Sequence, residues 1–466
     1  MSTQISWLSS VARRLGLCLL AFGLALGVMA VVLVAGQAHA TTMPRPFFLT
    51  PDWVASGELP GDYFGKSVGT AGDVNGDGYD DVIIGDPVHA RAYLYLGSVS
   101  GLGYHPAVTV TGEALLDQFG EVVATAGDVN GDGYADVIVG AWFYNSETGR
   151  TYVYHGSENG LNTTPAFIAT GEEPFSYFGR AVGTAGDVNA DGYDDVIIGA
   201  FQYFNATGRA YVYLGSANGL GATPAFTATG ETSFDGFGVS VGTAGNVNAD
   251  GYADIIVGAL WTGGAGRAYV YQGAANGLSP TPVFSVSGAA PYDRLGISVR
   301  TAGDVNGDGY SDVLIGAMGW YTSTGWAYVY TGSVNGLYTT PAIVAAGETA
   351  NDGFGSLVRP GGDINADGYD DVIIGAPNYL TQTGRIYIYL GTASGLSATP
   401  TFTLTGEAPY DFYGETAGTA GDVNGDGYAD LIIGAWGYSN FTGRAYAYYG
   451  SAFILGFRLH LPLLQR

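Results

Sequence analysis

One nine-residue segment, Asp73–Asp81, carries side chains that could do chemistry. Its sequence, DVNGDGYDD, places Asp, Asn, Asp and Asp at positions 1, 3, 5 and 9, and the backbone carbonyl of Tyr79 is available at position 7. Oxygen ligands at alternate positions suit a hard divalent cation, which takes about six to eight of them. Gly78 at position 6 permits the sharp turn that such a loop needs. The segment therefore predicts a metal-binding loop.

The loop recurs seven times, starting at residues 73, 128, 187, 246, 304, 363 and 422, at intervals of 55, 59, 59, 58, 59 and 59 residues. Positions 1, 3, 5, 7 and 9 of each copy are the predicted metal ligands: Asp73, Asn75, Asp77, Tyr79, Asp81; Asp128, Asn130, Asp132, Tyr134, Asp136; Asp187, Asn189, Asp191, Tyr193, Asp195; Asn246, Asn248, Asp250, Tyr252, Asp254; Asp304, Asn306, Asp308, Tyr310, Asp312; Asp363, Asn365, Asp367, Tyr369, Asp371; Asp422, Asn424, Asp426, Tyr428, Asp430.

The donor set favours calcium, with up to seven ions bound. Neither His nor Cys occurs in the loops, which disfavours zinc, and a large number of oxygen donors favours calcium over magnesium. An EF-hand is excluded because position 12 is Ile or Val in every copy, where that motif needs a bidentate Glu. The alternative is an Asx-rich turn without an ion, which leaves the Asp at position 9 of all seven copies unexplained. Asn246 replaces the first Asp, so we expect the fourth site to be the weakest.

The segments around each loop predict four strands per repeat. In the third copy they are YFGRAVGTAG from Tyr177, DVIIGA from Asp195, GRAYVYLG from Gly208 and PAFTATG before residue 231. A period near 59 residues with four strands per unit is typical of propeller blades. We therefore predict an all-β fold, a seven-bladed propeller over residues 50–451. The last repeat, 412–450, lacks a fourth strand, and residues 52–57 (DWVASG) match one, which predicts closure of the ring by the N-terminal strand.

These repeats resemble FG-GAP repeats, the units of the integrin α-subunit β-propeller, and in particular bacterial exported propellers. The repeat contains a Phe–Gly pair, intact at Phe64, Phe119, Phe178, Phe237 and Phe354 with the glycine that follows each. The pair is altered to Leu295–Gly296 and Tyr413–Gly414. The second element, Gly–Ala–Pro, is complete only at residues 375–377. The resemblance covers about residues 50 to 450. It implies the propeller fold, but the family binds diverse ligands, so it says little about the partner.

The N-terminus predicts export. Arg13 and Arg14 precede an apolar run that ends in AHA at residues 38–40, so we expect residues 1–40 to be a signal peptide cleaved after Ala40; an uncleaved anchor is the alternative. Residues 41–49 then form a short linker, and residues 452–466 form a tail without an assigned role. The only cysteine, Cys18, lies in the leader, so calcium is expected to stabilise the fold where disulfides cannot.

Removing the leader leaves 42 acidic and 14 basic residues, a net charge of −28, which argues against nucleic acid and anionic membranes as partners. The loops hold 23 of those acids, so much of the acidity is explained as metal ligands. We expect a secreted or cell-surface monomer that does not insert into the membrane once the leader is removed.

No constellation of nucleophile and base is apparent, so we predict no enzyme. The segments GKSVG (65–69) and GVSVG (238–242) match a serine-hydrolase motif, but they lie in predicted strands rather than at a strand–turn–helix elbow. A polysaccharide-active lyase or glycosidase, and a structural component of the cell envelope, are the alternatives to a binding module.

The loops between the second and third strands differ between repeats and are rich in aromatic residues. By resemblance to integrins, they lie on the ligand face, opposite the acidic loops, and would bind a protein or glycan partner. The alternative is that the rings pack on each other around the central channel. The candidate ligand residues are Trp142, Tyr144, Tyr203, Trp261, Trp320, Tyr321, Tyr379, Trp436 and Tyr438.

Overall fold

The apolar run that follows each acidic loop forms a strand with no exposed residue. Six consecutive buried residues, with three Val, Ile or Leu residues in a row, suit a central strand that is covered on both faces. In the computed structural model, which describes residues 50–319 and 324–452, these second strands are β3 (Asp81–Asp86), β7 (Asp136–Ala141), β11 (Asp195–Ala200), β15 (Asp254–Ala259), β19 (Asp312–Ala317), β23 (Asp371–Ala376) and β27 (Asp430–Ala435).

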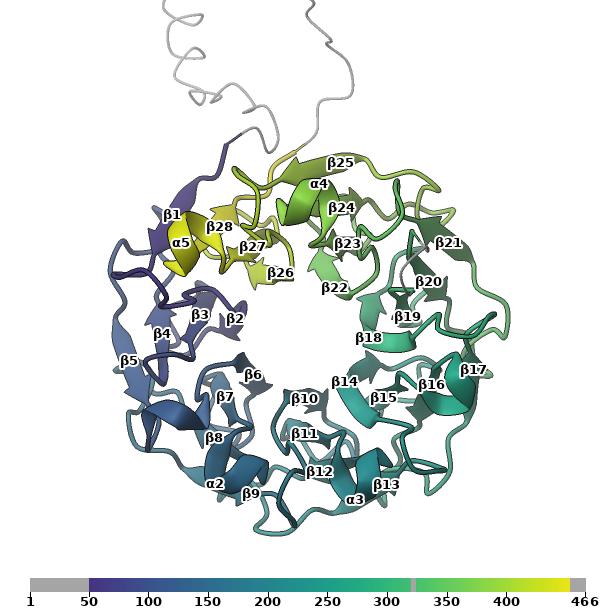
Figure 1. Cartoon of the computed structure of the whole chain (residues 1–466). Helices are drawn as coiled ribbons and strands as arrows, with labels where there is room; N and C mark the ends of the chain where they lie inside the picture. The colour runs from purple at the N-terminus through teal and green to yellow at the C-terminus, as the bar shows by residue number, and fades with distance from the viewer. Residues whose placement is uncertain (1–49, 320–323, 453–466) are drawn as a thin grey trace, which may run out of the picture. The chain divides into compact units, whose positions relative to one another are not determined.

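Each second strand lies in a four-stranded antiparallel sheet, and the seven sheets surround a central channel (Figure 1). The strands nearest the channel are β2 (Val68–Gly72), β6 (Val122–Gly127), β10 (Ala181–Gly186), β14 (Phe237–Gly245), β18 (Leu295–Gly303), β22 (Leu357–Gly362) and β26 (Thr416–Gly421). The third strands are β4 (Arg91–Tyr95), β8 (Arg150–Tyr154), β12 (Arg209–Tyr213), β16 (Arg267–Tyr271), β20 (Trp326–Tyr330), β24 (Arg385–Tyr389) and β28 (Arg444–Tyr448). The outer strands are β5 (Val108–Thr111), β9 (Phe167–Thr170), β13 (Phe226–Thr229), β17 (Phe284–Ser287), β21 (Ile343–Ala346), β25 (Phe402–Thr405) and β1 (Trp53–Ser56). The predicted seven-bladed β-propeller is confirmed.

The ring closes through the N-terminal strand, as predicted. Strand β1 pairs antiparallel with β28, from Trp53 opposite Ala447 to Ser56 opposite Arg444, and completes the sheet in the order β1-β28-β27-β26. The strand is two residues shorter than the predicted range of 52–57. The Trp53 indole N–H also donates to the Gly103 carbonyl oxygen of the first blade (2.9 Å), so the closing strand contacts both blades at the seam.

Short helical turns lie at one end of the blades. Four of them join second to third strands: α2 (Tyr144–Glu147), α3 (Tyr203–Ala206), α4 (Tyr379–Gln382) and α5 (Tyr438–Phe441). In blade 4 this place is taken by η2 (Thr262–Gly264). The remaining turn, η1 (Leu115–Asp117), lies in the connection between blades 1 and 2. The N–H of Phe175, in a blade connection, donates to the Ser146 carbonyl of α2, so turns and connections share this end. We call it the aromatic face, and the end that carries the acidic loops the acidic face.

The core lies between neighbouring blades. One cluster joins Ile83 and Leu94 of blade 1 to Val137 and Tyr152 of blade 2. The first residue of every FG or altered FG pair is buried, at Phe64, Phe119, Phe178, Phe237, Leu295, Phe354 and Tyr413. The glycine of that pair approaches the preceding blade so closely that a Cβ on Gly140 would overlap the Gly179 carbonyl oxygen. The repeated glycines thus set the spacing of the blades.

Several predictions lie outside the described residues. The leader 1–40, the linker 41–49 and all but the first residue of the tail 452–466 belong to this group, as do Trp320 and Tyr321. Between residues 50 and 452, the described chain contains no helix that is long and apolar enough to span a membrane.

Candidate functional site

Each acidic loop is folded around the side chain of its first residue, a carboxylate in six copies and the Asn246 amide in the fourth. In the first copy, Asp73 Oδ1 accepts the backbone N–H groups of Gly76 (2.6 Å) and Asp77 (3.1 Å), and Asp73 Oδ2 accepts that of Gly78 (2.8 Å). Gly78 has a φ of 88°, which glycine adopts without strain. In the fourth copy the Asn246 amide oxygen accepts only the Asp250 N–H among the loop's amides, so this loop is held less firmly.

The Asp at position 9 is buried in all seven copies and joins the loop to the end of the third strand. Asp81 Oδ2 accepts the Val74 N–H (3.0 Å), and Oδ1 accepts the Gly97 N–H (2.9 Å). The same pair of bonds holds the equivalent aspartates Asp136, Asp195, Asp254, Asp312, Asp371 and Asp430. This structural role was not predicted, because the strand-end glycine lies 16 residues away in the chain.

Burial makes these carboxylates costly to ionise. It raises the pKa of Asp81 to about 7, against the two backbone hydrogen bonds, and the charges of Asp77 and Asp73 add to the rise. The pKa of Asp254 rises only to about 6, and there a single neighbouring charge, Asp250, contributes because Asn246 is neutral. A cation beside these groups would stabilise their ionised form.

The oxygen donors of the loops are of the type that calcium prefers. Six loops offer carboxylates at positions 1, 5 and 9, the fourth has Asn246 at position 1, and all seven offer an amide oxygen at position 3 and a carbonyl at position 7. As the described loops stand, no group of three or more His, Cys, Asp or Glu side chains is placed to hold a metal ion. In the first loop the Asn75 amide donates to Asp77 Oδ2 (2.9 Å), so both side chains must turn before their oxygens can face one ion.

The acidic loops are linked to one another around the ring. The backbone N–H at position 8 donates to the carbonyl of position 1 in the preceding blade, through Asp80, Ala135, Asp194, Ala253, Ser311, Asp370 and Ala429. Where position 8 is Asp, its carboxylate also accepts the N–H of that first residue, as between Asp80 and Asp422 (2.8 Å). The extra aspartates are therefore contacts between blades rather than additional ligands.

On the aromatic face, the predicted ligand tyrosines stack on arginines. Tyr144, Tyr203, Tyr379 and Tyr438 each begin a helical turn, and each ring centre lies 3.6–4.0 Å from a guanidinium carbon, of Arg150, Arg209, Arg385 and Arg444. Each arginine also forms an ion pair with a glutamate of the preceding connection, at Glu113, Glu172, Glu348 and Glu407. These tyrosines are half-buried and hold the turns in place.

The tryptophans of this face differ in exposure. Trp436 is half-buried and stacks on Phe412 with ring centres 4.4 Å apart, and the Lys66 ammonium lies 4.2 Å from its ring centre. Trp142 is half-buried against Tyr177 (4.8 Å between ring centres). Trp261 is 37% exposed. Packing therefore explains two of these tryptophans and leaves Trp261 available for a ligand.

A further aromatic set was missed in the sequence. Phe175, Phe234, Tyr292 and Tyr410 stand at one position of four blade connections, and all are well exposed. Their φ angles lie between 62° and 70°, a conformation that bulky residues rarely adopt. Their recurrence three residues before the altered or intact FG pair was visible in the sequence, but their exposure was not.

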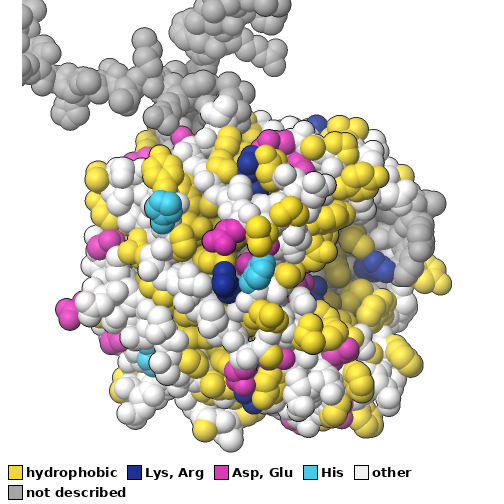
Figure 2. Space-filling model, turned by 60° about the vertical axis from the view of Figure 1, so that its left-hand side comes forward, with side chains coloured by type: hydrophobic (Ala, Val, Ile, Leu, Met, Phe, Trp, Pro, Cys, Tyr) yellow, Lys and Arg dark blue, Asp and Glu magenta, His cyan; other side chains and the backbone are white. Residues whose placement is uncertain are grey.

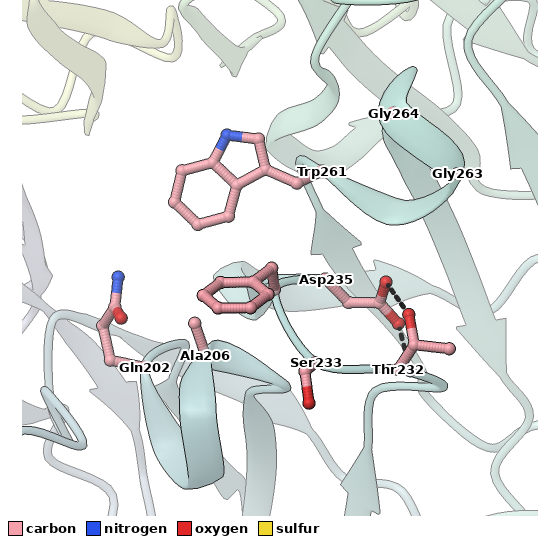
Figure 3. A pocket seen from close by; sticks show the side chains of 9 residues that line it. Gln202, Ala206, Thr232, Ser233, Asp235, Trp261, Gly263 and Gly264 are labelled. Atoms are coloured by element: carbon pink, nitrogen blue, oxygen red, sulfur yellow. Dashed lines mark hydrogen bonds between the residues drawn. The ribbon is translucent and has the colours of Figure 1, made fainter.

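A pocket of about 560 Å³ opens on this face between blades 3 and 4, lined by Gln202, Ala206, Thr232, Ser233, Phe234, Asp235, Trp261, Gly263 and Gly264. Here η2 takes the place that the tyrosine-anchored turn has in blades 2, 3, 6 and 7, and a Cβ on Gly263 or Gly264 would meet open space. Figure 3 shows Trp261 and Gln202 on opposite sides of the pocket, and Asp235 turned toward Thr232.

The pocket combines aromatic surface with neutral polar groups. Asp235 is buried, and its carboxylate accepts the backbone N–H groups of Glu231 (2.8 Å) and Thr232 (2.7 Å) and the Thr232 hydroxyl (2.9 Å). The hydrogen bonds of the Asp235 carboxylate are therefore made within the connection between blades 3 and 4. Figure 2 shows hydrophobic side chains spread over one side of the molecule, with basic and acidic groups lying next to one another among them. The pocket is suited to a neutral ligand that has an apolar face.

The serines of the two G-x-S-x-G segments have structural partners. Ser67 Oγ accepts the Val123 N–H and Ser240 Oγ accepts the Val299 N–H, both at 3.0 Å and both from the next blade. Ser240 lies within strand β14, away from any strand–turn–helix elbow. These hydroxyls therefore join blades.

Comparison with known proteins identifies the repeats. The FG-GAP repeat family matches residues 237–271, 296–334, 354–389 and 414–448, and the FG-GAP-like repeat family matches residues 73–139 and 128–198, together more than half of the chain. The chain is 34% identical to integrin alpha-8 of Gallus gallus over 223 residues, 45% of this chain and 21% of that protein. It is 32% identical to integrin alpha-V of Gallus gallus over 232 residues, 47% of this chain and 22% of that protein.

The matched region thus spans about a fifth of the length of these integrins. The repeats, the acidic loops and the closed ring of seven blades agree with these matches. The chain belongs to the FG-GAP repeat family of β-propellers, which resemble the propeller of integrin α-subunits.

Proposed function

We propose that this protein is an exported, calcium-binding propeller that binds a protein or glycan partner through its aromatic face. The pocket between Phe234 and Trp261 is the observation that carries the proposal. Phe234 is 71% exposed although its φ of 68° is unfavourable, and such strain is typical of residues kept for function. The similarity to integrin α-subunits supports a binding role rather than an enzymatic one.

A glycan is the ligand that this pocket favours. The face of an indole suits the apolar face of a sugar ring, and Gln202 and Ser233 offer hydrogen bonds to hydroxyl groups. No lining residue other than Asp235 is ionisable, and that carboxylate is already satisfied. A neutral saccharide therefore fits better than a charged peptide.

The binding test compares Trp261→Ala with Tyr338→Ala on a panel of neutral polysaccharides and surface proteins. Tyr338 is also exposed, at 57%, but it lies in the turn between β20 and β21 at the acidic end of the blade. We expect Trp261→Ala to lose retention on the cognate ligand and Tyr338→Ala to keep it. Equal retention by both variants would refute the assignment to the aromatic face. Turnover of a polysaccharide would instead favour the enzyme alternative.

Calcium binding is the second part of the proposal. It is supported by the donor set of seven loops and by the buried aspartates at position 9, whose ionisation a cation would stabilise. Because binding to the folded state alone raises stability, a chelator should lower the melting temperature of the purified protein, and added calcium should restore it. An unchanged melting temperature would contradict the proposal. Export is tested separately, by sequencing the N-terminus of the mature protein, which should begin at Thr41.

A further inference from the structure

The innermost strands differ at one position that faces the central channel. Five blades carry a small residue there, at Gly69, Ala124, Gly183, Gly242 and Gly418, whereas blades 5 and 6 carry Arg300 and Arg359. The strands pair with their second strands in equivalent registers, so these seven residues are structurally equivalent. Two neighbouring blades therefore place two long cationic side chains in the channel. The other five blades have a small, uncharged residue at the same position.

The channel holds a cavity of about 280 Å³ that both arginines line. Arg300 extends over blade 4, where a Cβ on Gly242 would lie 2.9 Å from its Cδ. Its Nη1 group donates to the Val299 carbonyl (3.0 Å) and to that of Val241. Arg359 extends over blade 5, and its Nη1 donates to Ser298 Oγ (3.1 Å) and to the Val358 carbonyl (2.9 Å). The absence of a side chain at Gly242 thus gives the Arg300 guanidinium group room, and the Arg359 guanidinium group lies beside Ser298 of blade 5.

Neither arginine forms an ion pair with any acidic residue in the described ranges 50–319 and 324–452. Burial lowers the pKa of Arg359 to about 10 and that of Arg300 well below its ordinary value, and the charge of Arg359 adds to the effect on Arg300. Arg300 and Arg359 are half-buried, and residues of all seven blades line the cavity around them. The positive charges here are therefore uncompensated by the chain itself.

Donors remain available for a ligand. A guanidinium has five N–H donors, and the hydrogen bonds to protein engage only the Nη1 group of each arginine. The Nε and Nη2 donors of both side chains have no acceptor among the described residues. Paired donors of this kind match the oxygen atoms of phosphate, sulfate or a carboxylate, and a bidentate contact is stronger than a neutral hydrogen bond.

We propose that Arg300 and Arg359 form a binding site for a small oxyanion, of the phosphate or sulfate class, inside the central channel. The remaining walls are made of Gly, Ala, Val, Thr, Ser and Pro, which bring no competing charge. The volume of the cavity admits a small ion with its water but not a polymer. The acidic loops lie at the ends of the strands, so their charge does not line this cavity. The bound anion would neutralise two charges that otherwise repel each other.

The test measures sulfate binding to the full chain by calorimetry and by thermal unfolding, with chloride at equal ionic strength as the reference. We expect the native protein to bind one sulfate and to melt at a higher temperature in sulfate than in chloride. Arg300→Gly/Arg359→Gly should abolish both effects, and it should fold because other blades carry glycine at this position. Arg150→Ala, which removes one positive charge on the aromatic face, is the control: whatever its melting temperature, it should bind sulfate with native affinity and keep the native difference between sulfate and chloride.

A second variant guards against misfolding of the first. Arg300→Lys/Arg359→Lys keeps both charges but removes the paired donors, so sulfate should bind at least tenfold more weakly. The proposal is overturned if native protein shows no greater stabilisation in sulfate than in chloride. It is also overturned if the glycine or lysine double variant keeps native sulfate affinity.

Discussion

The residue Trp53 should account for much of the stability of the ring closure. Its side chain is 3% exposed, packs edge-on against Tyr95 with ring centres 5.0 Å apart, and donates to the Gly103 carbonyl. Replacing a buried tryptophan with alanine costs about 3–5 kcal/mol. At an unfolding entropy of about 2.1 cal/mol/K per residue, roughly 400 ordered residues lose about 4–6 °C in melting temperature for that cost.

The assay is thermal unfolding of Trp53→Ala beside Val54→Ala and Trp53→Phe. Val54 is the next residue of the same strand, with its side chain 37% exposed on the opposite face, so its loss should change stability by less than about 0.5 kcal/mol. Trp53→Phe keeps an aromatic ring and loses the hydrogen bond, so it should fall between the two. If Trp53→Ala melted within 1 °C of Val54→Ala, a threshold of roughly 1 kcal/mol at this size, the claim that Trp53 secures the closing strand would be refuted.

Three more predictions concern the glycines, the buried Glu121 and the fourth loop. Gly434→Ala, whose Cβ would overlap the Gly65 carbonyl oxygen, should cost more than about 2 kcal/mol in urea unfolding, whereas Gly418→Ala meets open space and should be neutral or stabilising. Burial raises the pKa of the Glu121 carboxyl above 4.5. The protonated side chain therefore stabilises the fold at low pH, and this stability is lost as the pH rises through the raised pKa. Glu121→Gln should remove this pH dependence from unfolding midpoints measured from below pH 4.5 to above the raised pKa. Under the calcium proposal, Asn246→Asp should tighten the weakest site severalfold in a calcium titration, and unchanged affinity would contradict its ranking.

The fold could be predicted because the chain repeats one unit seven times. A single DVIIGA run is compatible with a buried strand or a helical segment, but seven copies at a near-constant spacing leave few architectures. The closing strand was predictable because residues 52–57 match the fourth strand that the last repeat lacks. Its bounds shifted by one residue at each end, to Trp53–Ser56, where pairing with β28 stops.

The sites were predicted less completely because their geometry depends on contacts distant in the chain. Asp81 was assigned as a ligand from its spacing, but its hydrogen bond to Gly97 depends on the path of the third strand. The exposure of Trp261 depends on η2, which takes the place that a tyrosine-anchored turn has in blades 2, 3, 6 and 7, and the sequence alone did not predict this difference. Arg300 and Arg359 occupy one position of the repeat in the sequence, but the cavity that both side chains line depends on closure of the ring.

The seam between the last blade and the first is built from the same contacts as the other junctions. Asp80 meets Asp422 across the seam as Asp194 meets Asp128 and Asp370 meets Asp304 within the continuous chain. The acidic face therefore does not distinguish the junction where the chain begins and ends. A variant that keeps residues 50–452, joins these two residues and opens the chain in the turn between β12 and β13 should give a circularly permuted protein with the same ring.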